Sequence, residues 1–230
     1  MYVRTSLYAL LLVPNFALAE ESFDAQVRDT LLRNPEIILE VFDLLEAQQA
    51  VAETEADLNL IEGVARHYFA DAPSETAILV EFVDYQCSYC RRAHGEVATL
   101  VEADQQFVRR VVQLPILGDV STAAAEIVLA IRADQGEEAY LAAHDAFMGG
   151  DARYTQRPML YVEEAGFDSG IIQQLTQSAE VQAEISQTRE IAQALGISGT
   201  PGFITRTNIL RGYADAATLS EAVFRFEEQE

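Results

Sequence analysis

The chain has 230 residues, half of them hydrophobic, and a formal net charge of −22. This length is enough for one sizeable hydrophobic core with an appendage. The charge argues against a nucleic-acid partner, because the phosphate backbone would repel so acidic a protein.

Residues 1–19 are predicted to form a secretory signal peptide. Arg4 supplies a positive charge, an apolar run follows from Leu7 to Val13, and residues 17–19 (Ala-Leu-Ala) fit the cleavage pattern, with the cut after Ala19. The apolar run is too short to span a bilayer core of about 30 Å. We therefore expect a mature chain in the periplasm, with an uncleaved anchor as the alternative.

Residues 20–57 are predicted to form an N-terminal helical region. A short amphipathic helix covers Phe23 to Leu32, and a second helix starts at Asn34-Pro35-Glu36, with Asn34 as its N-cap, and runs to about Phe69. The second helix either packs on the main domain or pairs with copies of itself. We favour homo-oligomerisation, because the apolar content near its start exceeds what one packing face needs. The apolar residues concerned are Ile37, Ile38, Leu39, Val41, Phe42, Leu44 and Leu45.

Residues 58–230 are predicted to form the main domain. Its predicted elements are, in order, a strand, a helix, a strand, a helical block, a hairpin and a helix, which describes an α/β, thioredoxin-like fold with a helical insertion. The strand at Ala77–Val83 is apolar on both faces except for Glu81, so we expect it to be central in its sheet. No clear first strand precedes it between His67 and Ser74. The other predicted elements are a helix from Cys90 to about Gln106, a strand at Phe107–Leu114, helices throughout about 118–195 with starts near Gln156, Ser169 and Glu180, strands at Phe203–Thr205 and Ile209–Gly212, and a helix at Ala216–Phe226.

The cysteines of the chain are Cys87 and Cys90, where the strand pattern gives way to a helix pattern. A disulfide between them would close almost no loop, so a purely stabilising role is weak even in an oxidising compartment. Residues i and i+3 of a helix lie roughly 5–6 Å apart, within reach of a disulfide. The helix N-terminus favours an anion at Cys87, which predicts Cys87 as the attacking thiolate and the more buried Cys90 as the resolving thiol. Arg91 and Arg92, which follow on the same helix, are expected to be solvated.

Metal binding is the main alternative for these two thiols. A structural zinc site needs four ligands, and the histidines His67, His94 and His144 show no paired ligand spacing. Two thiolates could instead hold a soft ion such as Cu(I). We therefore expect no resident cofactor and no zinc site, and we keep Cu(I) binding by Cys87 and Cys90 as the alternative.

Two further features point to a site around the cysteines. Strand alternation places Glu81 on one face with Leu79 and Val83, which predicts a buried carboxylate with no evident partner that tends to take up a proton. Such a group could move protons for the Cys90 thiol. Thr200-Pro201 lies in a Gly-Thr-Pro-Gly turn, and X-Pro bonds are where cis peptides occur.

Three stretches together resemble the DsbA family of thioredoxin-fold thiol–disulfide oxidoreductases, over roughly Ala77 to the C-terminus. They are VEFVDYQCSYCRRAH, LPILGDVSTAAAEIVLAI and GISGTPGFI. The resemblance implies that Cys87 is the nucleophile, Cys90 the resolving thiol and Glu81 the buried acid. It also implies a cis-proline at Pro201. The residues it implies for substrate contact are Ser88, Tyr89, Thr200 and Pro201.

The N-terminal region looks like the added region of ScsC-like members, which are associated with copper tolerance and include trimeric isomerases. Ser88-Tyr89 replaces the Pro-His pair of the strongly oxidising members, where the histidine helps to stabilise the thiolate, so a weaker oxidant is expected. Gly202 stands where many relatives have a larger residue.

The implied function is a periplasmic oxidase or isomerase. Its substrates would be cysteine-containing exported proteins, and a membrane protein would be its redox partner. The alternative is a non-catalytic copper-binding or chaperone module.

Overall fold

The structure is a computed structural model that describes residues 22–103 and 107–224. The predicted signal peptide lies outside these residues. So do the predicted helix ends beyond residues 103 and 224. The chain divides into two compact units, Met1–Ala50 and Val51–Glu230. The boundary after residue 57 proposed from the sequence stays a prediction. No helix among the described residues is both long enough and apolar enough to cross a membrane.

The first unit contains α1 (Phe23–Arg33) and the start of α2 (Glu36–Tyr68), so both predicted helices form. Ser22 caps α1 by accepting the N–H of Ala25. The predicted capping role of Asn34 in α2 is wrong, because its side-chain amide donates to the Thr30 carbonyl at 2.8 Å and closes α1 instead. None of the described residues in this unit is buried.

The second unit is built on a four-stranded sheet of order β2-β1-β3-β4. Its strands are β1 (Ala77–Val83), β2 (Phe107–Gln113), β3 (Gly202–Ile204) and β4 (Ile209–Leu210). Strand β1 pairs in parallel with β2 and antiparallel with β3, and all its residues are buried, which confirms its predicted central place. The parallel pair is joined by the crossover helix α3 (Ser88–Ala103), as such a pair requires.

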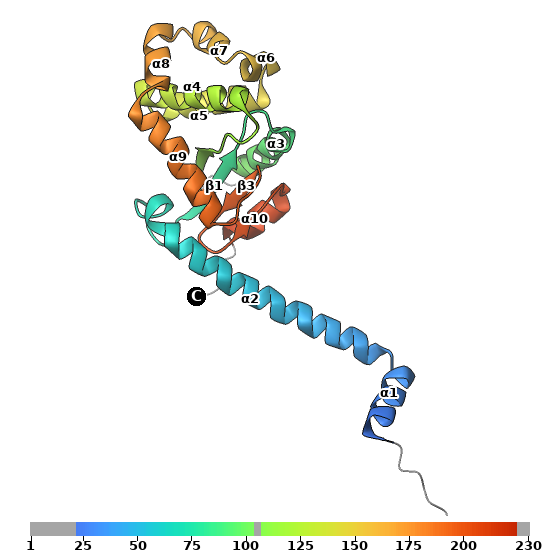
Figure 1. Cartoon of the computed structure of the whole chain (residues 1–230). Helices are drawn as coiled ribbons and strands as arrows, with labels where there is room; N and C mark the ends of the chain where they lie inside the picture. Colours follow the sequence, from blue (N-terminus) through green and yellow to red (C-terminus); the bar gives the residue numbers. More distant parts are fainter. Residues whose placement is uncertain (1–21, 104–106, 225–230) are drawn as a thin grey trace, which may run out of the picture. The chain divides into compact units, whose positions relative to one another are not determined.

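Between β2 and β3 the chain forms the predicted helical insertion, in which α4 (Asp119–Gln135) and α5 (Glu137–Gly149) lie side by side (Figure 1). The helix predicted from about Gln156 begins at Met159, and a short helix that was not predicted precedes it at Ala152–Gln156. Pro158 separates the two, because it disfavours helical geometry at Arg157. The insertion contains α4 (Asp119–Gln135), α5 (Glu137–Gly149), α6 (Ala152–Gln156), α7 (Met159–Glu164), α8 (Ser169–Thr176) and α9 (Ala179–Ala194), and α10 (Ala216–Phe224) closes the described chain.

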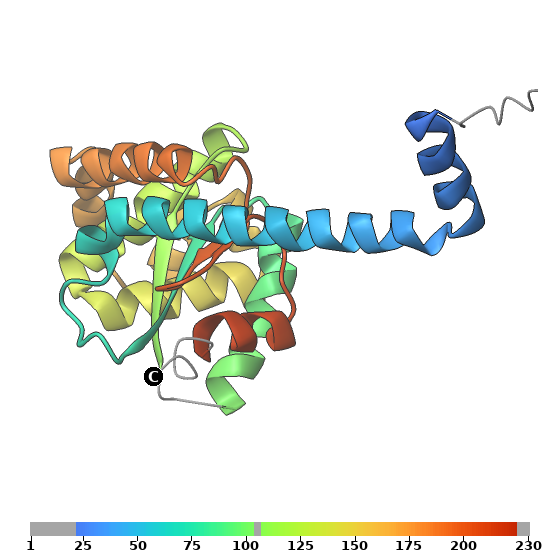
Figure 2. The same ribbon diagram turned by 90° about the horizontal axis from the view of Figure 1, so that it is seen from below.

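Three apolar clusters hold this unit together. The end of α2 packs with Ile78, Val80 and Phe82 of β1 and with the end of α9. Leu79 packs with α3 and α10, which lie side by side in Figure 2. The third cluster joins Val83 and both cysteines to α4 and α5. The dithiol therefore lies where the carboxyl end of β1 meets the insertion.

Candidate active site

Cys87 occupies the N-cap place of α3. Its carbonyl oxygen accepts the N–H of Arg91 at 3.2 Å, and its Sγ accepts the N–H of Cys90 at 3.3 Å. Both cysteines are free thiols, with 7% of Cys87 and 2% of Cys90 exposed. Burial raises the pKa of the Cys90 thiol above its ordinary value. The less buried sulfur therefore faces the positive end of the α3 dipole, and the deeper one is held protonated.

The Thr200-Pro201 turn lies against the dithiol, although it is more than a hundred residues away in the chain. The peptide bond between these residues is cis, and the Cys87 thiol donates to the Thr200 carbonyl at 3.2 Å. A Cβ atom at Gly202 would lie 2.7 Å from Ile197 Cγ2, a distance that real Cβ atoms do not adopt. The glycine that departs from many relatives is therefore required by the packing of Ile197.

Glu81 is buried as predicted, with 2% of its surface exposed. The prediction that it has no partner is wrong, because Arg109 Nε donates to its Oε1 at 2.5 Å. Arg109 lies opposite Leu79 in the parallel register, so it shares the face of β1 and β2 that carries Glu81. Burial still raises the pKa of the Glu81 carboxyl, and Arg109 opposes that rise. The partner could have been found from the sequence only if the register had been known.

Asp84 fixes the loop between β1 and the dithiol, a role that the sequence analysis missed. Its buried carboxylate accepts the N–H groups of Gln86 at 2.8 Å, Ile116 at 2.8 Å and Leu117 at 3.0 Å, and also the hydroxyl of Ser121. It therefore joins the loops that follow the two parallel strands. An acid directly after a buried strand, at the start of Asp-Tyr-Gln-Cys, was the available signal.

Side chains beside the thiols form an exposed rim. Ser88 is exposed, and Tyr89 is 60% exposed with its ring 6.4 Å from that of Tyr213. Arg92 is exposed as expected and lies over the Tyr213 ring, 4.3 Å from its centroid. Arg91 was expected to be solvated but is partly buried, because it donates to the carbonyls of Tyr85 and Phe147. Sequence reasoning missed Tyr213, which joins this rim from the loop before α10.

The histidines do not supplement the two thiols. His67 is exposed near the end of α2. His94 and His144 meet with their ring centroids 5.4 Å apart, beside Asp145, and the ligand atoms of these three residues lie within 4.8 Å of one another. Neither cysteine belongs to this group. The zinc site that was considered for the dithiol thus lacks histidine ligands.

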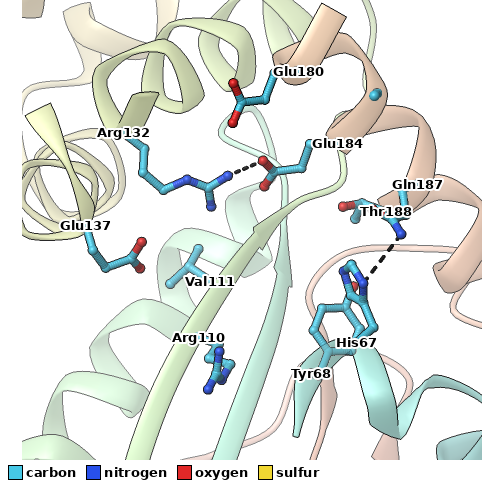
Figure 3. Close-up of a pocket in the computed structure, with 11 residues that line it drawn as sticks. His67, Tyr68, Arg110, Val111, Arg132, Glu137, Glu180, Glu184, Gln187 and Thr188 are labelled. Carbon is cyan, nitrogen blue, oxygen red and sulfur yellow. Dashed lines mark hydrogen bonds and ion pairs between the residues drawn. The ribbon is translucent and has the colours of Figure 1, made fainter. Parts of the chain in front are cut away.

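A cavity of about 520 Å³ lies elsewhere, between β2, α9 and the end of α2 (Figure 3). Its charged lining is largely paired, since Arg132 bonds Glu184 and Arg110 bonds Asp71. Gln187 contacts His67 at 3.4 Å. None of the predicted site residues lines this cavity, so the dithiol interpretation does not depend on it.

Two family matches divide the chain. Residues 78–224 match the DSBA-like thioredoxin domain, and residues 20–52 match the copper resistance protein ScsC N-terminal domain. A search of curated proteins found no match.

Similar solved structures carry related descriptions. A thioredoxin-like oxidoreductase from Silicibacter pomeroyi DSS-3 is 35% identical, with 66% of this chain and 87% of that chain covered and a TM-score of 0.60. The thiol-disulfide exchange protein alpha-DsbA2 from Wolbachia pipientis is 21% identical, with coverages of 76% and 98% and a TM-score of 0.66. A linker-deletion mutant of Proteus mirabilis ScsC is 22% identical, with coverages of 93% and 100% and a TM-score of 0.63. The last two likenesses show the fold alone.

Proposed function

The chain belongs to the DsbA-like thioredoxin family of thiol–disulfide oxidoreductases, and on that premise we propose that it is a periplasmic oxidase or isomerase of exported proteins. The observation that carries this proposal is the contact between Cys87 Sγ and the Thr200 carbonyl at 3.2 Å, with Cys90 one helical turn behind. This arrangement leaves one sulfur near the surface for a substrate and a second sulfur behind it for resolution.

The exchange would proceed in two balanced steps. The Cys87 thiolate attacks one sulfur of a substrate disulfide, so that a mixed disulfide forms and the other substrate sulfur leaves as a thiolate, which takes up a proton. Cys90 then loses its proton and attacks Cys87 Sγ, which releases the second substrate thiolate and leaves the Cys87–Cys90 disulfide. The two steps in reverse oxidise a substrate dithiol. A membrane redox partner would reset the pair.

We propose that Glu81 accepts the proton that Cys90 loses in the second step. Both groups are buried, and burial raises the pKa of each, which disfavours their charged forms. A buried carboxylate whose pKa is raised is a better proton acceptor than an ordinary glutamate. While the Glu81 carboxyl is ionised, the positive charge of Arg109 compensates its negative charge.

Ser88, Tyr89 and Thr200 would contact the substrate next to its cysteine. Ser88 and Tyr89 are exposed on the first turn of α3, and Thr200 is half-buried with Pro201 behind it. An extended substrate segment could pair with the Thr200 backbone once Cys87 has left its carbonyl.

The mixed disulfide provides the test. The variant Cys90→Ala, incubated with a peptide disulfide, should accumulate a covalent complex through Cys87 that mass spectrometry detects. Cys87→Ser should form no complex and should lose disulfide exchange. Full exchange by Cys87→Ser would refute the proposal. The equilibrium of the wild-type protein with glutathione then gives the direction of electron flow, because an oxidase needs a less stable disulfide than a reductase.

A copper-binding or chaperone role is the second candidate. The match of residues 20–52 to a copper resistance domain favours copper binding over the chaperone role. Two thiolates one helical turn apart suit Cu(I), which prefers soft ligands. This candidate predicts that Cu(I) binding follows function in the cell while disulfide exchange does not. Loss of exchange and loss of function together, with Cu(I) binding unchanged, would exclude it.

We further propose that residues 22–50 make the chain a homo-oligomer. Most of their large apolar side chains are exposed, including Leu39 and Phe42, and such a surface is unusual on a soluble monomer. Sedimentation velocity of the full chain should show an assembly that Leu39→Glu and Phe42→Glu break. The exposed neighbour Glu40, changed to Gln, is the matched control. A wild-type monomer would remove this proposal.

A further inference from the structure

Arg109 is the centre of a charged cluster behind the dithiol. Besides Glu81, its guanidinium donates to Asp145 Oδ1 at 3.2 Å, to His144 Nε2 at 2.9 Å and to His94 Nδ1 at 3.4 Å. These groups come from β1, α3 and α5, and together with Arg109 of β2 they form what we call the Arg109 cluster. A guanidinium has five N–H donors in a fixed plane, which suits it to join groups from several elements.

The cluster does not leave room for a metal ion in this arrangement. His94, His144 and Asp145 offer three ligand atoms close together, but each of these residues accepts a hydrogen bond from Arg109. The guanidinium is thus the cation of this site. A metal ion would have to displace it from Glu81 and leave a buried carboxylate uncompensated, which is strongly unfavourable.

Both histidines of the cluster are neutral in this arrangement, because each accepts a hydrogen bond from a cation. Burial and the Arg109 charge lower the pKa of His94, and they lower that of His144 further. With Nε2 accepting, His144 carries its proton on Nδ1, which faces the Tyr85 hydroxyl at 3.3 Å. Burial also raises the pKa of Tyr85, so that phenol stays protonated.

The remaining titratable groups are two carboxylates that share one guanidinium. Glu81 is buried, whereas 53% of the Asp145 side chain is exposed and therefore stays hydrated. Asp145 competes with Glu81 for the positive charge of Arg109, and it also repels an ionised Glu81. Both effects favour the protonated form of Glu81. The two histidines of the cluster are neutral, and the phenols beside it are Tyr85 and Tyr161, whose pKa values burial raises.

We propose that Asp145 is a positioning residue that sets, through Arg109, how readily Glu81 takes the proton of Cys90. This inference rests on the proposed disulfide exchange and on the assignment of Glu81 in it. Asp145 makes Glu81 a stronger base and moves the acidic limit of the Cys90 step to higher pH. A half-exposed residue on α5 thereby controls a buried step at the end of β1.

The Cys90 step can be followed alone. Reduced protein treated briefly with one equivalent of 5,5′-dithiobis(2-nitrobenzoate) carries thionitrobenzoate on the more exposed Cys87. Cys90 then attacks Cys87 Sγ, so the Cys87–thionitrobenzoate bond breaks, the Cys87–Cys90 bond forms and the coloured thiolate leaves. Stopped-flow absorbance gives the rate of this step as a function of pH.

Asp145→Asn should shift the acidic limb of this profile to lower pH, by on the order of half a pH unit. Asp145→Glu should restore the wild-type limb. Glu138→Gln, which removes the same charge from an exposed position of α5, should leave the limb unchanged. Glu81→Gln should abolish the limb, and Asp145→Asn should then have no further effect.

A limb that is the same in Asp145→Asn and in wild type overturns the inference, while Cys87-dependent exchange leaves the proposed function standing. A limb that survives in Glu81→Gln overturns it too, because another group then takes the proton. If the proposed function fails instead, Cys90 releases no thionitrobenzoate from Cys87 in any of these variants.

Discussion

The backbone N–H of Cys90 donates to Cys87 Sγ at 3.3 Å, which makes the two thiols unequal although they lie in one helical turn. Cys87 is also the more exposed sulfur, and burial raises the pKa of Cys90. Iodoacetamide at neutral pH should therefore modify Cys87 first in the reduced protein. In Cys87→Ser, Cys90 should react at least tenfold more slowly than Cys87 does in Cys90→Ala, as measured by mass spectrometry. Equal rates would contradict the geometry.

Asp84 should contribute more to stability than any other polar residue near the dithiol. Asp84→Ala leaves the N–H groups of Gln86, Ile116 and Leu117 without their acceptor. A hydrogen bond to a charged group contributes about 1.5–3 kcal/mol, so we expect the free energy of unfolding to fall by about 3 kcal/mol in urea titrations. Ser121→Ala removes a single donor and should cost about 1 kcal/mol. An Asp84→Ala variant as stable as Ser121→Ala would refute this role.

The sequence was sufficient for those parts of the fold that local patterns determine. The apolar run at Ala77–Val83 predicted a central strand because a strand buried on both faces has no polar alternation. The dithiol was identified because few residue types provide thiol chemistry, whereas the residues at Thr200-Pro201 indicated only a turn and the family resemblance implied its cis peptide.

The partners of the buried charges could not be predicted in the same way. Arg109 reaches Glu81 through the parallel register of β1 and β2, and His144 reaches Arg109 through the packing of α5. Neither relation leaves a signal in sequence spacing. Arg91 shows the same limit, since its helix position suggested a solvated side chain but α5 lies within its reach.

His144 should make the stability of the protein fall in mild acid. Burial holds its folded pKa well below the unfolded value of about 6.5, so below that pH the unfolded chain binds a proton that the folded chain rejects. Its contribution is complete above pH 6.5 and decreases as the pH falls, by up to about 1.4 kcal/mol per pH unit. Burial raises the folded pKa of Glu81, so Glu81 acts in the opposite sense, by adding stability as the pH falls toward about 4.5.

Comparison of wild type with His144→Gln separates the contribution of His144 to the pH dependence of stability from that of the other titrating groups. The amide oxygen of His144→Gln can still accept from Arg109, but the side chain does not titrate. Its free energy of unfolding should decrease less between pH 6.5 and 5 than that of wild type. His67→Gln, at an exposed histidine, should keep the wild-type slope. A wild-type slope in His144→Gln would show that His144 protonates in the folded state.

Tyr89 is the position at which the direction of electron flow can be tested. Its side chain lies on the exposed rim beside Cys87 and is directed to Tyr213, so it provides no charge to the sulfur. In the strongly oxidising relatives a histidine at this position helps to stabilise the thiolate. Tyr89→His should therefore stabilise the reduced form and raise the reduction potential measured against glutathione. A shift of 30 mV corresponds to about 1.4 kcal/mol. Tyr89→Phe, which keeps the ring but adds no charge, should retain the wild-type potential. If Tyr89→His also retains the wild-type potential, the buried groups near the dithiol set the potential, and the exposed residues Ser88 and Tyr89 between the cysteines do not.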